Sequence, residues 1–168
     1  FKIMSSLHKN LSDYNLSNIP SAAGMRIAVV VSEWNTEITE ALFTGLRDCL
    51  LDLGCSPSDI LRKNVPGSFE LPLGAQWMAE TQQADAVVCL GCVIQGETRH
   101  FDFICSSVAD GLMNLGIKFS IPFIFGVLTP NTMEQATDRA GGKHGNKGIE
   151  AALTAVKMIA LRRELKKG

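Results

Sequence analysis

The sequence has almost no net charge and contains no long apolar run. Its 168 residues include 16 Lys and Arg against 17 Asp and Glu, which gives a net charge of -1 at pH 7. This balance leaves no basic surplus for the phosphates of a nucleic acid or for an anionic membrane surface. No apolar stretch reaches the roughly 18 residues of a membrane-spanning helix, and residues 1–24 lack the apolar segment of a secretory signal. We therefore expect a cytoplasmic protein that binds neither nucleic acid nor membranes.

The chain also lacks a metal-binding pattern, although it contains 5 cysteines and 3 histidines. The segment CLGC has the C-x-x-C spacing, but no second such pair exists to complete a zinc site, and the histidines are far apart. A redox-active C-x-x-C usually opens a helix, whereas Cys89 lies inside the apolar run AVVCLGCVI. We interpret most of these cysteines as small buried hydrophobes in a reducing compartment, namely Cys49, Cys89, Cys92 and Cys105.

What the sequence does contain is an alternation of apolar runs and helical patterns. Three apolar runs, at 25–33, 84–94 and 121–129, and the short segment at 60–67 predict four buried strands. Helical spacing predicts helices over 35–54, 69–83, 101–116, 132–140 and 149–167. Strands joined by helical crossovers imply one parallel sheet covered on both faces, a three-layer α/β/α fold. We expect a single domain over 25–168 and an extended arm over 1–24.

The ends of two of these helices can be predicted from single residues. Thr36 is expected to cap the first helix, and Gly54 is expected to end it. Gly116 is expected to end the third helix in the same way.

Sheets of this kind bind ligands beyond the carboxyl ends of their strands, at a switch in strand order. The first strand is followed at once by Trp34 and Asn35. An exposed ring there offers a flat face to a planar ligand, and the alternative is a core tryptophan. The second strand is followed by a Pro-Gly turn and by Ser68, Phe69 and Glu70, which are typical of a helix start and add a ring, a hydroxyl and a carboxylate.

The third strand leads into the segment GCVIQGETRHFD, which predicts an anion site. Gly96 lets the backbone turn, and the N–H groups of residues 96–98 precede a helix, where hydrogen bonding and the helix dipole favour an anion. Thr98 adds a hydroxyl. His100 is next to this junction, and an imidazole exchanges protons near neutral pH. We interpret His100 as a candidate acid/base, although a single histidine can equally be structural.

The fourth strand end supplies a ring and cations. Phe125 lies near the end of the strand, and Arg139 and Lys147 can provide positive charge for a phosphate. The run GGKHGNKG is not a P-loop, because Asn146 and Gly148 replace the residues that this motif requires around its lysine. The four strand ends together favour a planar heterocycle bound beside a phosphorylated small molecule.

Six segments in series resemble the lumazine synthase family, across residues 25–163. They are SEWNTEIT, VPGSFELP, GCVIQGETRHFDFI, PFIFGVLT, EQATDRAGG and GNKG. The resemblance implies a flavodoxin-like, four-stranded sheet and a condensation of 5-amino-6-(D-ribitylamino)uracil with 3,4-dihydroxy-2-butanone 4-phosphate. An imine forms, phosphate leaves, and the ring closes with loss of water. The family uses no cofactor and no metal.

The resemblance also implies a role for each candidate residue. His100 would be the general acid/base, and Arg139 would arrive from a neighbouring subunit to hold the phosphate with Glu97 and Thr98. The residues around the heterocycle and its ribityl chain would be Trp34, Ser68, Phe69, Glu70, Cys92, Val93, Ile94 and, from a neighbouring subunit, Phe125. Asn35, Asp138 and Lys147 are expected accessory residues.

Members of this family assemble as pentamers, and many pack twelve pentamers into a 60-subunit icosahedral shell. We therefore expect a homopentamer, and a shell because GGKHGNKG resembles the loop of shell-forming members. The arm over 1–24 would add a strand to a neighbouring sheet. Riboflavin synthase is a further expected partner.

Three alternatives stay open at this stage. The chain could be a non-catalytic flavin- or phosphate-binding module on the same sheet, or a shell-forming protein with a decayed site. It could also be a riboflavin synthase of the archaeal type, which joins two lumazines. The set His100, Arg139 and Phe69 argues against a decayed site.

Overall fold

The computed structural model describes residues 12–167 and contains one central sheet. Its strands, all parallel, lie in the order β2-β1-β3-β4. Their bounds are β1 Ile27–Ser32, β2 Ile60–Val65, β3 Ala86–Cys92 and β4 Phe123–Leu128. The predicted four-stranded parallel sheet is confirmed. Because β2 pairs with one side of β1 and β3 with the other, the switch in strand order lies between β1 and β3.

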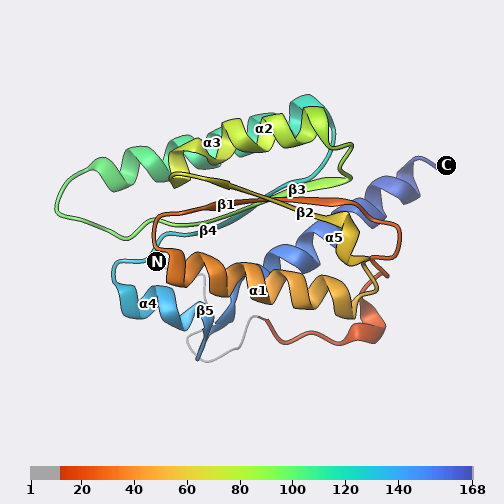
Figure 1. Cartoon of the computed structure of the whole chain (residues 1–168), viewed down its shortest axis with the longest axis horizontal. Helices are drawn as coiled ribbons and strands as arrows, with labels where there is room; N and C mark the ends of the chain where they lie inside the picture. Colours follow the sequence, from red (N-terminus) through yellow and green to blue (C-terminus); the bar gives the residue numbers. More distant parts are fainter. Residues whose placement is uncertain (1–11, 168) are drawn as a thin grey trace.

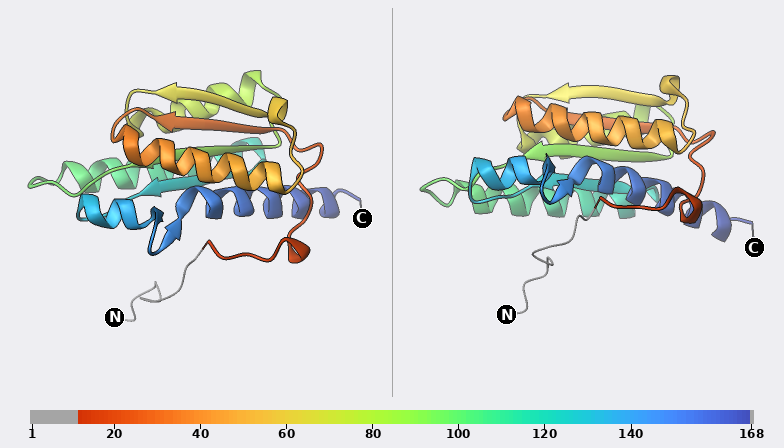
Figure 2. Two further views of the ribbon diagram at one scale, coloured as in Figure 1. Left: turned by 60° about the horizontal axis from the view of Figure 1, so that its bottom comes forward. Right: turned by 90° about the horizontal axis from the view of Figure 1, so that it is seen from below.

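Helices cover both faces of the sheet, which confirms the three-layer architecture (Figure 1). The helices are α1 Thr36–Asp52, α2 Leu71–Thr81, α3 His100–Phe119, α4 Met133–Asp138 and α5 Lys147–Leu165. The pair α1 and α5 packs on one face, and the pair α2 and α3 packs on the other. The short α4 lies beside α1 and α5 at the end of the sheet where the strands finish (Figure 2).

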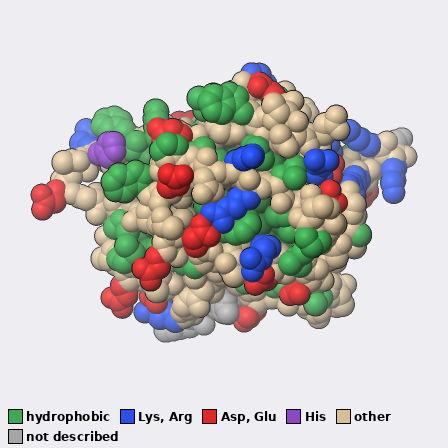
Figure 3. Space-filling model, in the orientation of Figure 1, with side chains coloured by type: hydrophobic (Ala, Val, Ile, Leu, Met, Phe, Trp, Pro, Cys, Tyr) green, Lys and Arg blue, Asp and Glu red, His purple; other side chains and the backbone are tan. Residues whose placement is uncertain are grey.

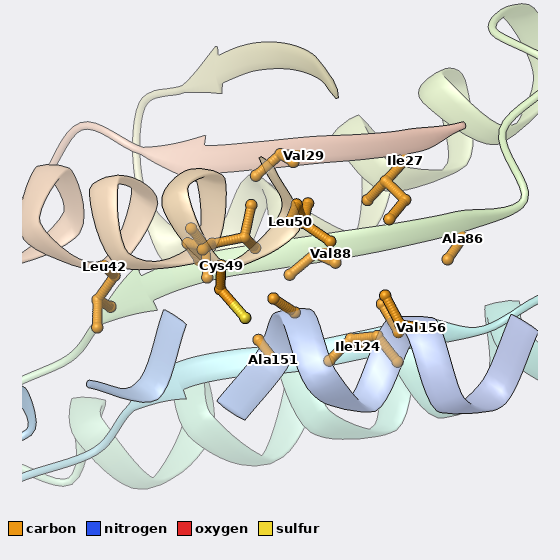
Figure 4. Packing of buried hydrophobic residues seen from close by; sticks show 14 of the residues in the cluster. Ile27, Val29, Leu42, Cys49, Leu50, Ala86, Val88, Ile124, Ala151 and Val156 are labelled. Carbon is orange, nitrogen blue, oxygen red and sulfur yellow. The ribbon is translucent and has the colours of Figure 1, made fainter. Parts of the chain in front are cut away.

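Apolar periodicity explains this packing. Leu42, Leu46 and Leu50 share one face of α1, and all three are fully buried against alternate residues of β1 and β3. Figure 4 shows the layer between the sheet and the helices α1 and α5, where Val29 and Val88 from neighbouring strands meet these side chains. Each such leucine contributes about 1.5–3 kcal/mol by leaving water. This burial fixes the strand ends that carry the candidate site.

The ends of the helices differ partly from the predictions. Gly54 follows α1 with a φ of 90°, which confirms it as the terminating residue. The prediction for Thr36 is wrong, because Thr36 is the first helical residue and Asn35 precedes it in the left-handed region with a φ of 56°. The prediction for Gly116 is also wrong. α3 continues to Phe119. Its C-cap is Ser120, which adopts the left-handed conformation, with a φ of 52°, that was expected of Gly116.

The glycine-rich run forms a hairpin. β5 Ala140–Gly142 pairs antiparallel with β6 Gly145–Asn146, and α5 begins directly afterwards at Lys147. Asn146 is buried, and its side chain joins two helices. Its Oδ1 accepts a bond of 2.7 Å from the N–H of Gly148 in α5, while its Nδ2 donates over 3.0 Å to the carbonyl of Ala41 in α1.

The described part of the arm, residues 12–24, lies along the layer of α1 and α5 (Figure 2). It contains the short turn η1 Leu16–Asn18, and Ala22 is fully buried against the core. Ser12 bonds to Asn146 through its hydroxyl. The strand that the arm was predicted to add to a neighbour involves residues 1–24, and residues 1–11 lie outside the described part.

The remaining expectations concern the cysteines and the surface. Four cysteines are buried and Cys105 is partly buried, and burial raises the pKa of each thiol. Across residues 12–167, no helix combines the length and apolar character needed to cross a membrane. In Figure 3, Lys and Arg are interspersed with Asp and Glu across the middle of this face, and Lys and Arg gather at its right-hand end.

Candidate active site

Trp34 lies at the carboxyl end of β1, with 71% of its surface exposed. Its backbone N–H donates to the carbonyl of Pro66 over 3.3 Å, and the N–H of Glu33 donates to that of Val65 over 2.9 Å. These bonds extend the pairing of β1 and β2, so the two loops that follow are held together. The predicted exposed ring is confirmed, and the alternative of a core tryptophan is wrong.

The segment after β2 forms a tight turn, η3 Ser68–Glu70, before α2 begins at Leu71. Phe69 is exposed, and Glu70 accepts a bond of 3.0 Å at Oε2 from the N–H of Gly67. Gly67 lies against Trp34, because a Cβ there would be 3.3 Å from the indole Cδ1. Ser68 is buried, so the hydroxyl expected at this rim points inward.

Asn35 joins the ends of the two central strands. Its side-chain Nδ2 donates a bond of 2.9 Å to the carbonyl of Cys92, at the end of β3. The thiol of Cys92 is buried, and burial raises its pKa to about 11. Val93 and Ile94 follow as partly buried residues that pack on opposite faces of the sheet. The Cys92 thiol therefore belongs to the core, whereas the side chains of Val93 and Ile94 are partly exposed to solvent.

The segment from Gln95 to Arg99 is exposed and precedes α3. Among residues 12–167, the backbone N–H groups of Gly96, Glu97 and Thr98 have no recorded acceptor. The hydroxyl of Thr98 accepts a bond of 3.3 Å from the N–H of His100, the first residue of α3. His100 is exposed, and α3 packs against η3. The free donors, the hydroxyl and the imidazole thus occupy one helix start.

We call the loops 33–35, 66–70 and 93–100 the rim. They follow β1, β2 and β3, and adjacent loops are joined by the bonds of Trp34 and Asn35. The rim thus holds most of the predicted site residues.

A second group of predicted residues lies on and after β4, at the edge of the sheet. Phe125 is the third of the six residues of β4, so the expectation that it lies near the end of the strand is wrong. Asp138, Arg139 and Lys147 follow β4 and line one cavity of about 680 Å³ with Phe125, and no residue of the rim lines it. We call the segment 138–150 the hairpin corner, since it includes β5, β6 and the start of α5. One chain therefore does not place Arg139 in the same cavity as His100.

Arg139 is held by its own chain. Its Nη1 donates to the carbonyl of His144 over 2.6 Å, and its Nη2 pairs with Oε1 of Glu150 at 2.7 Å. Lys147 approaches the other oxygen of Glu150 at 3.5 Å. Lys143 pairs with Asp138 at 2.9 Å, and this bond raises the pKa of the ammonium. His144 is therefore a structural partner of Arg139 through its backbone.

Sequence reasoning missed three residues that shape these regions. Glu150 was not singled out, although its spacing three residues after Lys147 in a helix is a signal for an ion pair. Asn146 was seen only as a failed P-loop position, although Asn before a helix is a typical cap. Ser32 gave no signal, because a small residue at the end of an apolar run is unremarkable in sequence.

Comparison with known proteins assigns the chain. The family model of 6,7-dimethyl-8-ribityllumazine synthase matches residues 24–163. The chain belongs to this family. A protein of that name from Cytophaga hutchinsonii is 59% identical over 94% of this chain and 98% of its own length. Those from Parabacteroides distasonis and Flavobacterium johnsoniae are 51% and 52% identical, over 93% and 96% of this chain and 98% and 85% of their own.

Membership of the lumazine synthase family confirms the predicted activity class, a transferase that forms 6,7-dimethyl-8-ribityllumazine. The non-catalytic alternative is not favoured by these relatives. Within residues 12–167, no group of three His, Cys, Asp or Glu side chains is arranged to hold a metal ion.

Proposed function

We propose that the chain condenses 5-amino-6-(D-ribitylamino)uracil with 3,4-dihydroxy-2-butanone 4-phosphate in a site shared by two neighbouring subunits. The observation that carries this proposal is the separation of the rim from the hairpin corner within one chain. The rim offers rings, free N–H groups and an imidazole, and its guanidinium, that of Arg99, is 82% exposed and approaches only one carboxylate, that of Asp102, at 3.9 Å, among residues 12–167. The hairpin corner offers a cation held for a phosphate at an exposed sheet edge. A second copy brings the two together.

Each residue has a physical role in this arrangement. Trp34 and Phe69 stack on or flank the pyrimidine, and Val93 and Ile94 support its other side. The N–H groups of residues 96–98 and the hydroxyl of Thr98 hold the phosphate from one subunit, beside Glu97. His100 moves protons as the imine forms, as phosphate leaves and as the ring closes.

The neighbour supplies Phe125 and Arg139. The guanidinium has five N–H donors, and among residues 12–167 it makes only two contacts, to His144 and Glu150. The remaining donors can bind a phosphate while the ion pair with Glu150 keeps the plane of the guanidinium fixed. Lys147 and Asp138 complete the charge around this corner.

The edge that carries Phe125 is apolar enough to meet another copy. A groove of about 680 Å³ runs between α3, β4 and α5, and Phe125 lines both this groove and the cavity at the hairpin corner. Met113, Ile117 and Leu161 are exposed along it. We assign this groove to a second copy of the chain in a homopentamer, with twelve pentamers forming a 60-subunit shell that associates with riboflavin synthase in the cytoplasm.

The activity is tested by a two-substrate assay on the purified chain, with product fluorescence as readout. Lumazine formation from both substrates is expected, and no turnover of lumazine alone. Turnover of lumazine as sole substrate would instead identify the archaeal-type riboflavin synthase. Light scattering on the same sample gives the mass. A 60-subunit particle is expected, and a pentamer alone would contradict the shell.

The shared site is tested by mixing two variants of strongly reduced activity, assayed with the phosphate substrate well below the KM of Arg139→Ala. His100→Ala and Arg139→Ala subunits, refolded together, are expected to recover about a quarter of the wild-type sites, because a heterologous interface joins the intact rim of one to the intact corner of the other. The control mixes Trp34→Ala with His100→Ala, which damage the same side and should not complement. Equal failure of both mixtures would place the whole site in one chain.

A further inference from the structure

Two buried hydroxyls beneath the rim have no partner. Ser32, the last residue of β1, is 1% exposed, and Ser68, the first residue of η3, is 6% exposed. Within residues 12–167, neither Oγ atom makes a hydrogen bond. A buried hydroxyl without a partner destabilises a protein by about 1–3 kcal/mol. The occurrence of two such groups at the switch point of the sheet therefore needs a cause.

Both hydroxyls border the same residue, Gly91 in β3. A Cβ at Gly91 would lie 2.7 Å from Oγ of Ser68, 3.3 Å from Oγ of Ser32 and 3.0 Å from Cδ1 of Leu71. The alternation of β1 explains this, because Ala28 and Val30 face the layer of α2 and α3, and Ser32 continues that face. The missing side chain of Gly91 leaves one small space that both serines enter.

We propose that Ser32 is a positioning residue, which forms a coupled hydroxyl pair with Ser68 over Gly91. Both Oγ atoms lie within 3.3 Å of the position that a Cβ of Gly91 would take, and a hydroxyl can donate and accept at once. The two are joined either directly after a small rotation about Cα–Cβ or through one shared water. In both cases the pair satisfies two buried groups that a single substitution would leave unmatched.

The pair ties the end of β1 to the start of η3. Ser32 lies two residues before Trp34, and Ser68 lies one residue before Phe69, so each serine is close along the chain to one of the two rings of the rim. The role of Ser32 in substrate binding rests on the proposed function, in which these rings hold the pyrimidine. The coupling of the two hydroxyls does not rest on it.

A double-mutant cycle on stability tests the coupling. Ser32→Ala and Ser68→Ala should each lower the urea midpoint, because each leaves the other hydroxyl unpaired. The urea midpoint of the double variant should be no lower than that of the less stable single variant, since both polar groups are gone. In the matched control, Thr39→Val is combined with Ser68→Ala. Thr39 is equally buried, but among residues 12–167 its hydroxyl donates only to the carbonyl of Thr36, in the same helix. The losses of stability from Thr39→Val and Ser68→Ala should therefore add. Additive effects of Ser32 and Ser68 would overturn the pair.

Gly91→Ala gives an independent check of the shared space. The added methyl collides with both hydroxyls in the wild type, and its destabilising effect should shrink when both serines are alanine. An unchanged effect in that background would also contradict the pair.

The positioning role is tested by kinetics well below the unfolding temperature. Ser32→Ala should raise KM for the pyrimidine substrate about 2- to 10-fold and leave KM for the phosphate substrate unchanged. A change in neither KM, with coupling present in the stability cycle, would overturn the positioning role. Failure of the wild type to make lumazine would instead overturn the proposed function, and would leave the stability cycle standing.

Discussion

The rim and the hairpin corner provide the two halves of the proposed site, and they are built in opposite ways. At the rim, Trp34, Phe69 and His100 are exposed, and neither the indole nor the imidazole makes a hydrogen bond within residues 12–167. Backbone bonds and the side chains of Asn35, Glu70 and Thr98 hold these loops. At the hairpin corner, Arg139 and Glu150 are bonded to one another and largely shielded from solvent.

The difference between exposed side chains at the rim and a bonded guanidinium at the corner follows from the proposed chemical role of each region. Stacking and proton transfer need free ring faces and an accessible imidazole, which a fixed backbone can present. A guanidinium that must meet a phosphate across a subunit boundary gains from being held beforehand, because less side-chain entropy is lost on binding. The comparison therefore predicts that changes at the corner affect folding and function together, and changes to the exposed side chains of the rim, Trp34, Phe69 and His100, affect function alone.

The largest effect is expected for Gly148→Ala, in the corner. A Cβ at Gly148 would lie 1.8 Å from the carbonyl oxygen of Leu42, so α1 and α5 would have to separate. We expect a loss of about 3 kcal/mol or more in unfolding free energy, measured by urea denaturation. Gly96→Ala, at the rim, is the control. Nothing lies within 4 Å of its added Cβ, so its stability should match the wild type.

His100→Ala should come next, with an effect on activity alone. Removing a positioned acid/base slows turnover by about 10²–10⁴-fold, but the bound substrates are still held in register. Turnover should therefore be slow rather than absent, and the urea midpoint should not change. Steady-state assays with product fluorescence measure this. Turnover equal to that of the wild type would show that His100 has no acid/base role.

Arg139→Ala should affect both properties, and so sharpens the contrast with His100. KM for the phosphate substrate should rise roughly 10- to 100-fold, because a charge-assisted contact is lost. Stability should also fall, since Glu150 keeps its partly buried charge without the guanidinium. Lys143→Ala is the control, because its exposed ammonium pairs only with Asp138. Equal effects of the two substitutions would contradict a special role for Arg139.

The smallest effect is expected outside both regions, at the pair of Glu40 and Arg62. Arg62 lowers the pKa of Glu40, so the pair stabilises the fold at neutral pH, and this contribution is lost as the pH falls through the lowered pKa. Glu40→Gln should lower stability by about 0.5 kcal/mol at pH 7, because the pair is half exposed. The difference should vanish well below the usual carboxyl pKa of about 4.3. A difference that persisted in acid would point to packing instead.

Much of the fold could be predicted because it depends on patterns along the chain. Three apolar runs, one short strand pattern and the helical spacing between them were sufficient for the strands, their parallel pairing and the three layers. The expectation that all four strands are buried is wrong for β2, which lies at the edge of the sheet and has no buried residue. Helix ends were less predictable. Gly116 does not end α3, because a glycine is compatible with a helix and the last turn packs the partly buried Phe119 beside Phe123 of β4.

The candidate site divides in the same way. Residue types and their positions after the strands were enough to single out Trp34, Phe69, His100 and Arg139. The partners of these residues were not predictable. Glu150 meets Arg139, and Ser32 meets Gly91, only when segments that are distant in the sequence pack together.

The sequence by itself determined the order of strands and helices, the exposed ring after β1 and the family to which the chain belongs, since these depend on local periodicity and on motifs in series. Only the tertiary structure decided that the rim and the hairpin corner lie apart, that Ser68 points inward beside Ser32, and that Arg139 is held by Glu150. The physical reason is that a contact between segments depends on strand order and helix packing, which no local stretch of sequence encodes alone.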